Sequence, residues 1–111
     1  MKLFHHKTKE TIKTAVLINH DLQHGFSTPV KITWFRNREL DPETTVFCTV
    51  KTETKEENGQ AAGFLNNNKE AQAMHEALTL AGLPATTTDP AAQLVTIAHH
   101  LKLIDYYILI L

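Results

Sequence analysis

Residues 20–24 read His-Asp-Leu-Gln-His, which is the pattern in this sequence closest to a metal site. The histidine spacing is that of His-Glu-x-x-His, in which two helical histidines share a zinc ion and the acidic residue activates a water. Asp21 is one methylene shorter than glutamate, Gly25 follows at once, and a third ligand would have to come from elsewhere. We therefore expect His20 and His24 to be surface histidines near a loop, with no bound metal or other cofactor. A metal-dependent hydrolase built on His20, Asp21 and His24 is the alternative.

A second pattern interleaves cations with aromatic residues over residues 31–38, which read Lys-Ile-Thr-Trp-Phe-Arg-Asn-Arg. Single-stranded nucleic acid binds where bases stack on exposed aromatic rings beside a basic track. On a strand Trp34 would share a face with Ile32 and enter the core, whereas Phe35 would face the other way with Lys31. An ordinary half-buried strand is the simpler interpretation. A nucleic-acid interface, if formed here, would use Lys31, Phe35, Arg36 and Arg38.

Nucleophilic catalysis finds little support in the sequence. Cys48 is the only cysteine and alternates with Val46 and Val50, so we expect a buried thiol with a raised pKa and low reactivity. Ser27 is the only serine, and neither a Gly-x-Ser-x-Gly elbow nor a glycine-rich phosphate loop occurs. These observations favour a protein without catalysis of its own.

The length and composition fit one globular domain over residues 1–111, of which residues 1–10 are expected to be a loose N-terminal segment. Of the 111 residues 42% are hydrophobic and 21% charged, and the formal net charge is −1. No apolar run is long enough to cross a bilayer, and no signal-peptide run follows the N-terminus. We therefore expect a cytoplasmic protein with no membrane partner.

Three segments alternate apolar and polar residues with the period of a strand. Residues 11–20 are rich in β-branched side chains, which favours a strand, with a helix as the alternative. Residues 30–35 follow Pro29, which suits the first position of a strand. Residues 45–54 repeat the alternation, so these segments together predict a sheet.

A hairpin is predicted after the third of these strands. Asn-Gly is a strong two-residue turn signal, because both residues readily adopt positive φ angles. Asn58-Gly59 therefore predicts a turn, followed by a short returning strand over about residues 61–65.

Two helices are predicted after residue 67, where the apolar period changes to that of a helix. The first spans about residues 69–81, with Asn68 as the N-cap and Gly82 at the C′ position. The second begins at Asp89-Pro90, an N-cap followed by proline in the first turn. The apolar residues expected on the buried faces are Ala71, Met74, Ala77, Leu78 and Ala81 in the first helix, and Ala91, Leu94, Val95, Ala98 and Leu101 in the second.

Residues 103–111 end in an unbroken apolar run from residue 106 to residue 111, and their isoleucine and tyrosine content favours a strand over a continuation of the helix. An uninterrupted apolar strand is typical of one buried on both faces. Burying six large side chains contributes roughly 9–18 kcal/mol. That rivals the net stability of a whole domain, about 5–15 kcal/mol, so we expect these side chains to be shielded from water.

Two helices cover only one face of such a sheet, which leaves the other face of the terminal strand without a cover. A second copy of the chain could cover it, by packing sheet faces or by pairing strand edges. Alternatively, the strand is central and a helix within residues 1–24 covers its second face. The oligomer interface predicted on this basis is Tyr106, Tyr107, Ile108, Leu109, Ile110 and Leu111.

The predicted fold is α+β, with a mainly antiparallel sheet of four or five strands and two consecutive helices packed on one face, in the order β-β-β-(β)-α-α-β. The predicted function is that of a small cytosolic, non-catalytic binding or assembly protein that self-associates. A different protein partner would also fit this function. A nucleic-acid-binding protein and the metal-dependent hydrolase are the alternatives.

Overall fold

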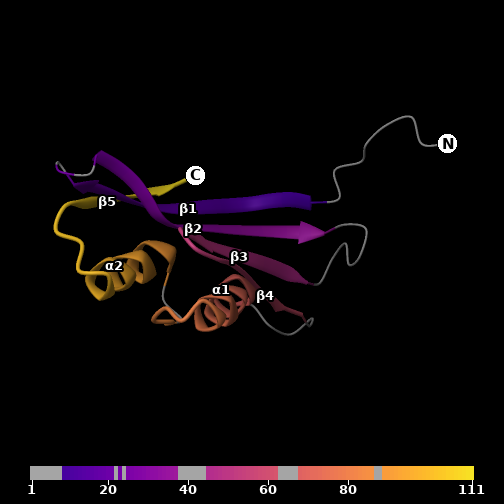
Figure 1. The fold of residues 1–111 in the computed structure, drawn as a ribbon. Coiled ribbons are helices and arrows are strands. Elements are labelled where there is room, and N and C mark those ends of the chain that lie inside the picture. The colour runs from indigo at the N-terminus through magenta and orange to yellow at the C-terminus, as the bar shows by residue number, and fades with distance from the viewer. Residues whose placement is uncertain (1–8, 22, 24, 38–44, 63–67, 87–88) are drawn as a thin grey trace, which may run out of the picture.

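The computed structural model describes residues 9–21, 23, 25–37, 45–62, 68–86 and 89–111. It confirms the α+β fold, with a five-stranded antiparallel sheet and two helices in the order β-β-β-β-α-α-β (Figure 1). The strand order in the sheet is β4-β3-β2-β1-β5. No helix among the described residues is long and apolar enough to span a membrane. The elements are β1 (Lys9–Asp21), β2 (Gly25–Asn37), β3 (Val46–Thr52), β4 (Glu56–Ala61), α1 (Lys69–Leu80), α2 (Pro90–His100) and β5 (Tyr106–Ile110).

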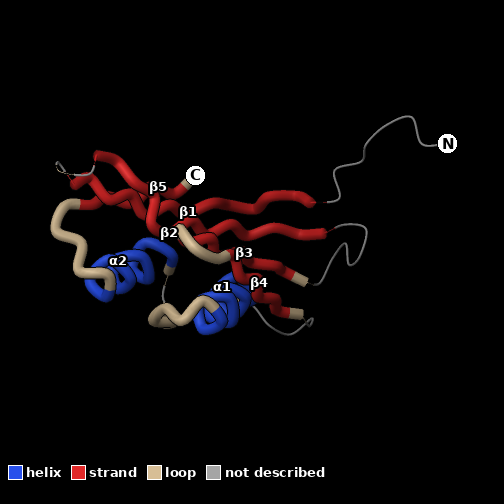
Figure 2. The backbone as a smooth tube through the Cα atoms, viewed as in Figure 1, coloured by secondary structure: helices blue, strands red, loops and turns tan. Residues whose placement is uncertain are grey.

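Both helices lie on the same side of the sheet, so the molecule has two layers (Figure 2). Strand alternation directs one set of side chains toward the helices, and these form the core with the helices' apolar faces. The indole of Trp34 is buried in this core and donates a hydrogen bond to the carbonyl oxygen of Glu70 at 2.8 Å. The largest fully buried side chains are Trp34, Leu17, Ile32, Met74, Leu78, Leu94, Ile97, Gln93, Val30, Val50 and Cys48.

The first two strands form a long hairpin. Residues 11–20 are a strand, as favoured, but β1 begins earlier, so Lys9 and Glu10 belong to the sheet rather than to a loose segment. Residues 1–8 lie outside the described residues. The second strand begins at Gly25, not after Pro29. Pro29 lies where the β1–β2 register is irregular, a position at which a missing backbone N–H interrupts no regular pair.

The turn between β3 and β4 lies earlier than predicted. The N–H of Thr52 donates to the carbonyl oxygen of Lys55 at 2.9 Å, which closes the hairpin there. Gly59, predicted to be in the turn, is inside β4 and pairs with Cys48. A Cβ on Gly59 would overlap the carbonyl oxygen of Ala73 in α1, so glycine is needed for close helix packing and not for a turn.

The returning strand was therefore misplaced as well. It covers Glu56–Ala61 and not residues 61–65. Residues 63–67 lie outside the described part of the chain.

Helix α1 agrees with its prediction at both ends. Gly82 has a φ of 75°, and the N–H of Leu83 donates to the carbonyl oxygen of Leu78 at 3.0 Å. With the bond from Gly82 to Thr79 at 3.1 Å, this is a Schellman motif. Asn68 occupies the N-cap position but makes no side-chain capping bond. Of the apolar face, Met74, Ala77, Leu78 and Ala81 are buried as expected, and Ala73 is buried in addition to them.

Helix α2 begins as predicted, with the carboxylate of Asp89 accepting a hydrogen bond from the N–H of Ala92 at 3.1 Å. Its buried face is rotated from the predicted one, because Gln93 and Ile97 are buried beside Leu94 and Ala98. The predicted face residues Ala91, Val95 and Leu101 are exposed instead.

Gln93 explains the rotation of α2. Its amide nitrogen donates to the carbonyl oxygen of Pro84 at 2.7 Å. Its amide oxygen accepts from the N–H of Thr86 at 2.6 Å and from the Thr86 hydroxyl at 2.5 Å. The buried amide thus satisfies backbone groups of the α1–α2 connection, which is why a polar side chain is stable inside the core.

Candidate interaction surface at the β5 edge

Strand β5 lies at the edge of the sheet and pairs with β1, from Ala15 opposite Ile110 to Asn19 opposite Tyr106 (Figure 1). The prediction of a strand is confirmed, whereas burial on both faces within one chain is wrong. Exposure is 42% for Tyr107, 40% for Leu109, 49% for Ile110 and 74% for Leu111. The physical reason is twofold: both helices lie on the other face of the sheet from Tyr107 and Leu109, and β5, as the terminal strand, has a neighbouring strand on one side only.

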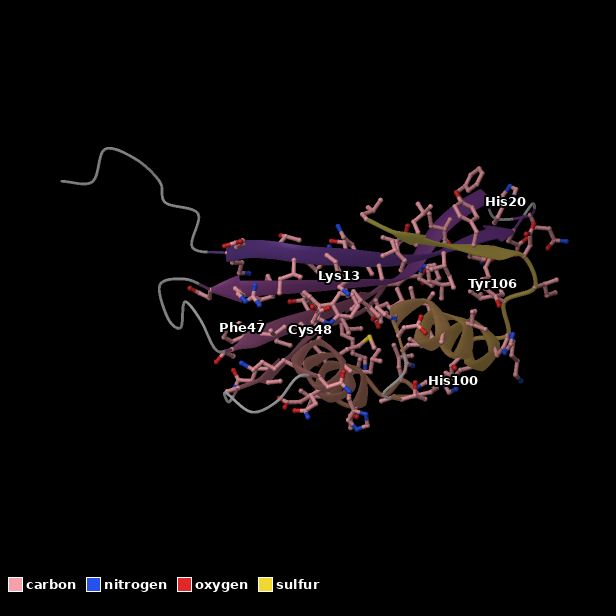
Figure 3. The ribbon with its side chains drawn as sticks, turned by 180° about the vertical axis from the view of Figure 1, so that it is seen from behind. Lys13, His20, Phe47, Cys48, His100 and Tyr106 are labelled. Carbon is pink, nitrogen blue, oxygen red and sulfur yellow. The ribbon has the colours of Figure 1, made fainter. Side chains whose placement is uncertain are left out.

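The inward side chains of β5 anchor the strand to the core. Tyr106 and Ile108 are partly buried and pack against the core cluster. Figure 3 shows Tyr106 on the α2 side of β5 and His20 on the opposite side. The ring of Tyr106 makes an edge contact with His99 of α2, with ring centroids 6.4 Å apart. The strand is therefore held in place while much of its side-chain surface stays in contact with solvent.

The hydrogen bonds to β1 determine which backbone groups of β5 face the open edge. Leu111 and Thr14 exchange two backbone bonds of 2.7 and 3.2 Å, and the N–H of His20 donates to the carbonyl oxygen of Asp105 at 2.8 Å. In an antiparallel ladder such bonded pairs alternate with non-bonded ones. Residues 105, 107, 109 and 111 therefore turn their backbone groups toward β1. Those of Tyr106, Ile108 and Ile110 point away from it, where the described part of the chain supplies no further strand.

An apolar surface adjoins this edge on the side of the sheet away from the helices. Val16 pairs with Leu109 and Ile18 pairs with Tyr107, so their side chains lie next to one another on that side. Phe26, which is 67% exposed, continues the surface at the end of the β1–β2 hairpin. We call the set Val16, Ile18, Phe26, Tyr107, Leu109 and Leu111 the apolar corner; Val16 is only 9% exposed, so the other members supply its accessible surface.

The apolar corner includes residues that were not predicted to be interface residues. Alternation along residues 11–20 already put Val16 and Ile18 on one face. No local signal identified β1 as the neighbour of β5, because strand order depends on contacts between distant parts of the chain. Phe26 gave no signal at all, since its segment was not predicted to be a strand.

His20 and Asp21 of the predicted metal motif lie in a strand and not in a helix. His20 and Asp21 end β1, and His24 lies outside the described residues. Within the described ranges, no group of three or more His, Cys, Asp or Glu side chains could hold a metal ion. His20 instead stacks on Phe26 with centroids 4.4 Å apart, and its Nδ1 is 3.5 Å from a carboxylate oxygen of Asp105. These contacts attach the hairpin end to the segment before β5.

An open cavity of about 430 Å³ lies beside this contact, between the β1–β2 hairpin end and the α2–β5 connection. Its lining mixes both charge signs, including Asp21, Asp105 and Lys102. The described side chains there show no arrangement of nucleophile and base.

The residues of the predicted nucleic-acid interface are divided between the two faces of the sheet. Lys31 and Phe35 share the helix-free face, while Arg36 follows Phe35 in the strand and belongs to the opposite face. Arg38 lies outside the described residues.

Phe35 is not a free stacking platform. It is only 9% exposed, because its ring stacks on Phe47 at 5.4 Å and Lys9 Nζ lies 4.8 Å from the ring centroid. This ring pair consumes the aromatic surface that a base would need. Phe47 was missed as its partner because the register of two strands cannot be deduced from either strand alone.

Cys48 is fully buried on the helix-facing side of β3, as predicted (Figure 3). Burial raises the pKa of its thiol from 9.0 to about 12, because the thiolate would lose its hydration. The neutral thiol is a poor nucleophile and a poor metal ligand.

Comparison with models of protein families, with curated proteins and with solved structures finds no match for this chain.

Proposed function

We propose that the protein is a small, non-catalytic assembly protein that self-associates through the edge of β5. One observation carries the proposal: an apolar edge strand whose outward backbone groups meet no strand of the described chain. Sheets normally protect such edges with charged residues, proline, bulges or a covering element. Residues 106–110 read Tyr-Tyr-Ile-Leu-Ile and contain neither a charge nor a proline.

Docking a second strand would satisfy the outward groups of Tyr106, Ile108 and Ile110 with ladder hydrogen bonds. It would also place cross-strand neighbours beside the half-exposed side chains of Tyr107 and Leu109. A second copy of the chain supplies a strand with the same needs, and symmetric dimers use the same surface on both subunits. The proposal includes a cytoplasmic location, which the single buried cysteine supports.

The direct test is sedimentation velocity of the full chain over a range of concentrations up to about 100 µM, a concentration at which a complex with a micromolar Kd is largely formed. We expect the mass to rise from monomer to dimer with concentration. Leu109→Lys puts a charge on the apolar corner and is expected to raise the Kd about tenfold or more, equivalent to roughly 1.4 kcal/mol.

Leu80→Lys is the matched control. Leu80 is 54% exposed on α1, which packs on β3 and β4 at the opposite end of the sheet from β5. It is expected to leave the Kd unchanged. A wild-type protein that stays monomeric over the whole range would overturn the proposal.

A further inference from the structure

We infer that the strand received at this edge is β5 of the second copy, antiparallel and centred on Ile108, so that two five-stranded sheets join into one continuous sheet. This inference rests on the proposed function and specifies its partner strand and register. It follows from the direction of the backbone groups on β5, the side chains beside them and the character of the opposite sheet edge.

The register follows from the three outward-facing residues. In an antiparallel ladder, bonded residues of one strand must oppose bonded residues of the other. With the two-fold axis at Ile108, Tyr106 opposes Ile110 of the second copy, Ile108 opposes its own equivalent, and Ile110 opposes Tyr106. An axis at residue 107 or 109 leaves one of the three without a partner inside the strand. Only the Ile108-centred register engages every outward group of β5.

The side chains are compatible with this register on both faces. On the helix-free face, Tyr107 would lie across from Leu109 of the second copy, which makes an aromatic-aliphatic cross-strand pair at both ends of the ladder. On the other face, half-exposed Ile110 would lie beside Tyr106 of the second copy. The dimer would therefore place a cross-strand neighbour beside each of Tyr107, Leu109 and Ile110, the residues of β5 with exposed apolar surface.

The opposite edge of the sheet argues against head-to-tail pairing. Strand β4 reads Glu-Glu-Asn-Gly-Gln-Ala and carries exposed Glu56, Asn58 and Gln60. Charged and polar edge residues discourage pairing, and β5 docked on β4 would bury Tyr107 and Leu109 against them. Head-to-tail pairing would also leave a free edge on every assembly and produce open chains. The structure therefore points to a closed dimer.

The test is disulfide trapping between two different single-cysteine substitutions, Tyr107→Cys and Leu109→Cys. Non-bonded antiparallel pairs have Cα atoms about 4.5 Å apart, which lies within the range of about 4.4–6.8 Å that a disulfide spans. Like residues would be offset by two positions along the strand, about 8 Å apart or more. An oxidised mixture of the two variants is expected to contain at least ten times more disulfide-linked dimer than either variant alone. The native Cys48 is fully buried and stays in place.

Two further mixtures distinguish the alternatives. Leu109→Cys mixed with Asn58→Cys would be trapped only by β5–β4 pairing, which would overturn the closed dimer. Leu80→Cys mixed with Leu109→Cys measures random collision and is expected to give the lowest yield.

Amide hydrogen exchange of the wild-type protein tests the same register without any substitution. The Ile108 and Ile110 amides are expected to be protected at dimer concentrations and to lose at least tenfold in protection on dilution. The Leu109 amide, already bonded to β1, is expected to stay protected. If sedimentation shows a dimer but the Tyr107/Leu109 mixture gives no excess of disulfide, this register is wrong and the proposed function stands. If sedimentation shows only monomer, the proposed function itself fails.

Discussion

The two ends of the sheet differ in how their edge strands are protected. At one end, β4 carries exposed charged and polar residues, and helix α1 packs so closely on its face that only glycine fits at position 59. At the other end, β5 is apolar throughout, and the apolar corner continues from β5 onto the helix-free face of β1. The contrast indicates that an apolar open edge is specific to β5, since the other edge strand of the same chain presents charged and polar residues instead.

The first prediction tests the β4 end of the sheet and has the largest expected effect. Gly59→Ala forces a methyl group into the backbone of α1 near Ala73 and Ala77, and we expect a loss of about 3 kcal/mol or more in unfolding free energy. Urea denaturation at fixed protein concentration measures it. The exposed neighbour Gln60→Ala is the control, expected within about 0.5 kcal/mol of wild type. Equal stability of both variants would mean that α1 does not rest on β4.

The second prediction concerns Cys48, which pairs with Gly59 under the same helix. Its pKa is raised from 9.0 to about 12 by burial, so the folded state keeps the proton that the unfolded state releases. The associated stability is fully present below pH 9 and is lost progressively as the pH rises toward 12. The slope approaches about 1.4 kcal/mol per pH unit.

The matched measurement compares wild type with Cys48→Ala by chemical denaturation at pH 8 and pH 10. The variant is expected to be less stable at pH 8 because it leaves a small cavity, and to lose less stability at the higher pH. Parallel losses in the two proteins would show that this end of the core admits water.

The third prediction tests the β5 end of the sheet and has the smallest expected effect. Lys102, between α2 and β5, has a φ of 59°, and its N–H donates to the carbonyl oxygen of His99 at 3.1 Å. This is the C′ position of a Schellman motif, where glycine avoids the strain of a side chain. Lys102→Gly is expected to raise the unfolding free energy by about 0.5–1 kcal/mol, as read from the thermal midpoint. Lys102→Ala keeps the strain, so a similar gain in that variant would contradict the explanation.

Local patterns in the sequence predicted most of the elements. Alternation identified β1, β2 and β3, and the Asp89-Pro90 and Gly82 signals located helix ends within one or two residues. The turn predicted at Asn58-Gly59 was wrong because glycine is suited both to a tight turn and to a close contact with a helix. The buried face of α2 was predicted without Gln93 because the burial of this residue depends on hydrogen-bond partners at Pro84 and Thr86, before the helix.

Only the β5 part of the candidate surface could be predicted from the sequence. The apolar character of residues 106–111 is evident from composition, and it predicted that these residues need a partner. Their place at the edge, and the contribution of Val16 and Ile18, depend on which strands become neighbours. The aromatic-basic segment around Phe35 failed for a related reason, since the Phe47 ring that occupies its surface is brought in by β3.

The amide of Gln93 has a consequence for a part of the molecule that it does not touch. By bonding to Pro84 and Thr86, it attaches the beginning of α2 to residues 84–86, and α2 in turn contacts Tyr106 through His99. Loss of these hydrogen bonds would let α2 shift and would weaken its contact with Tyr106 of β5. The position of an edge strand is therefore expected to depend on a carboxamide in the interior of the protein, near the other end of α2.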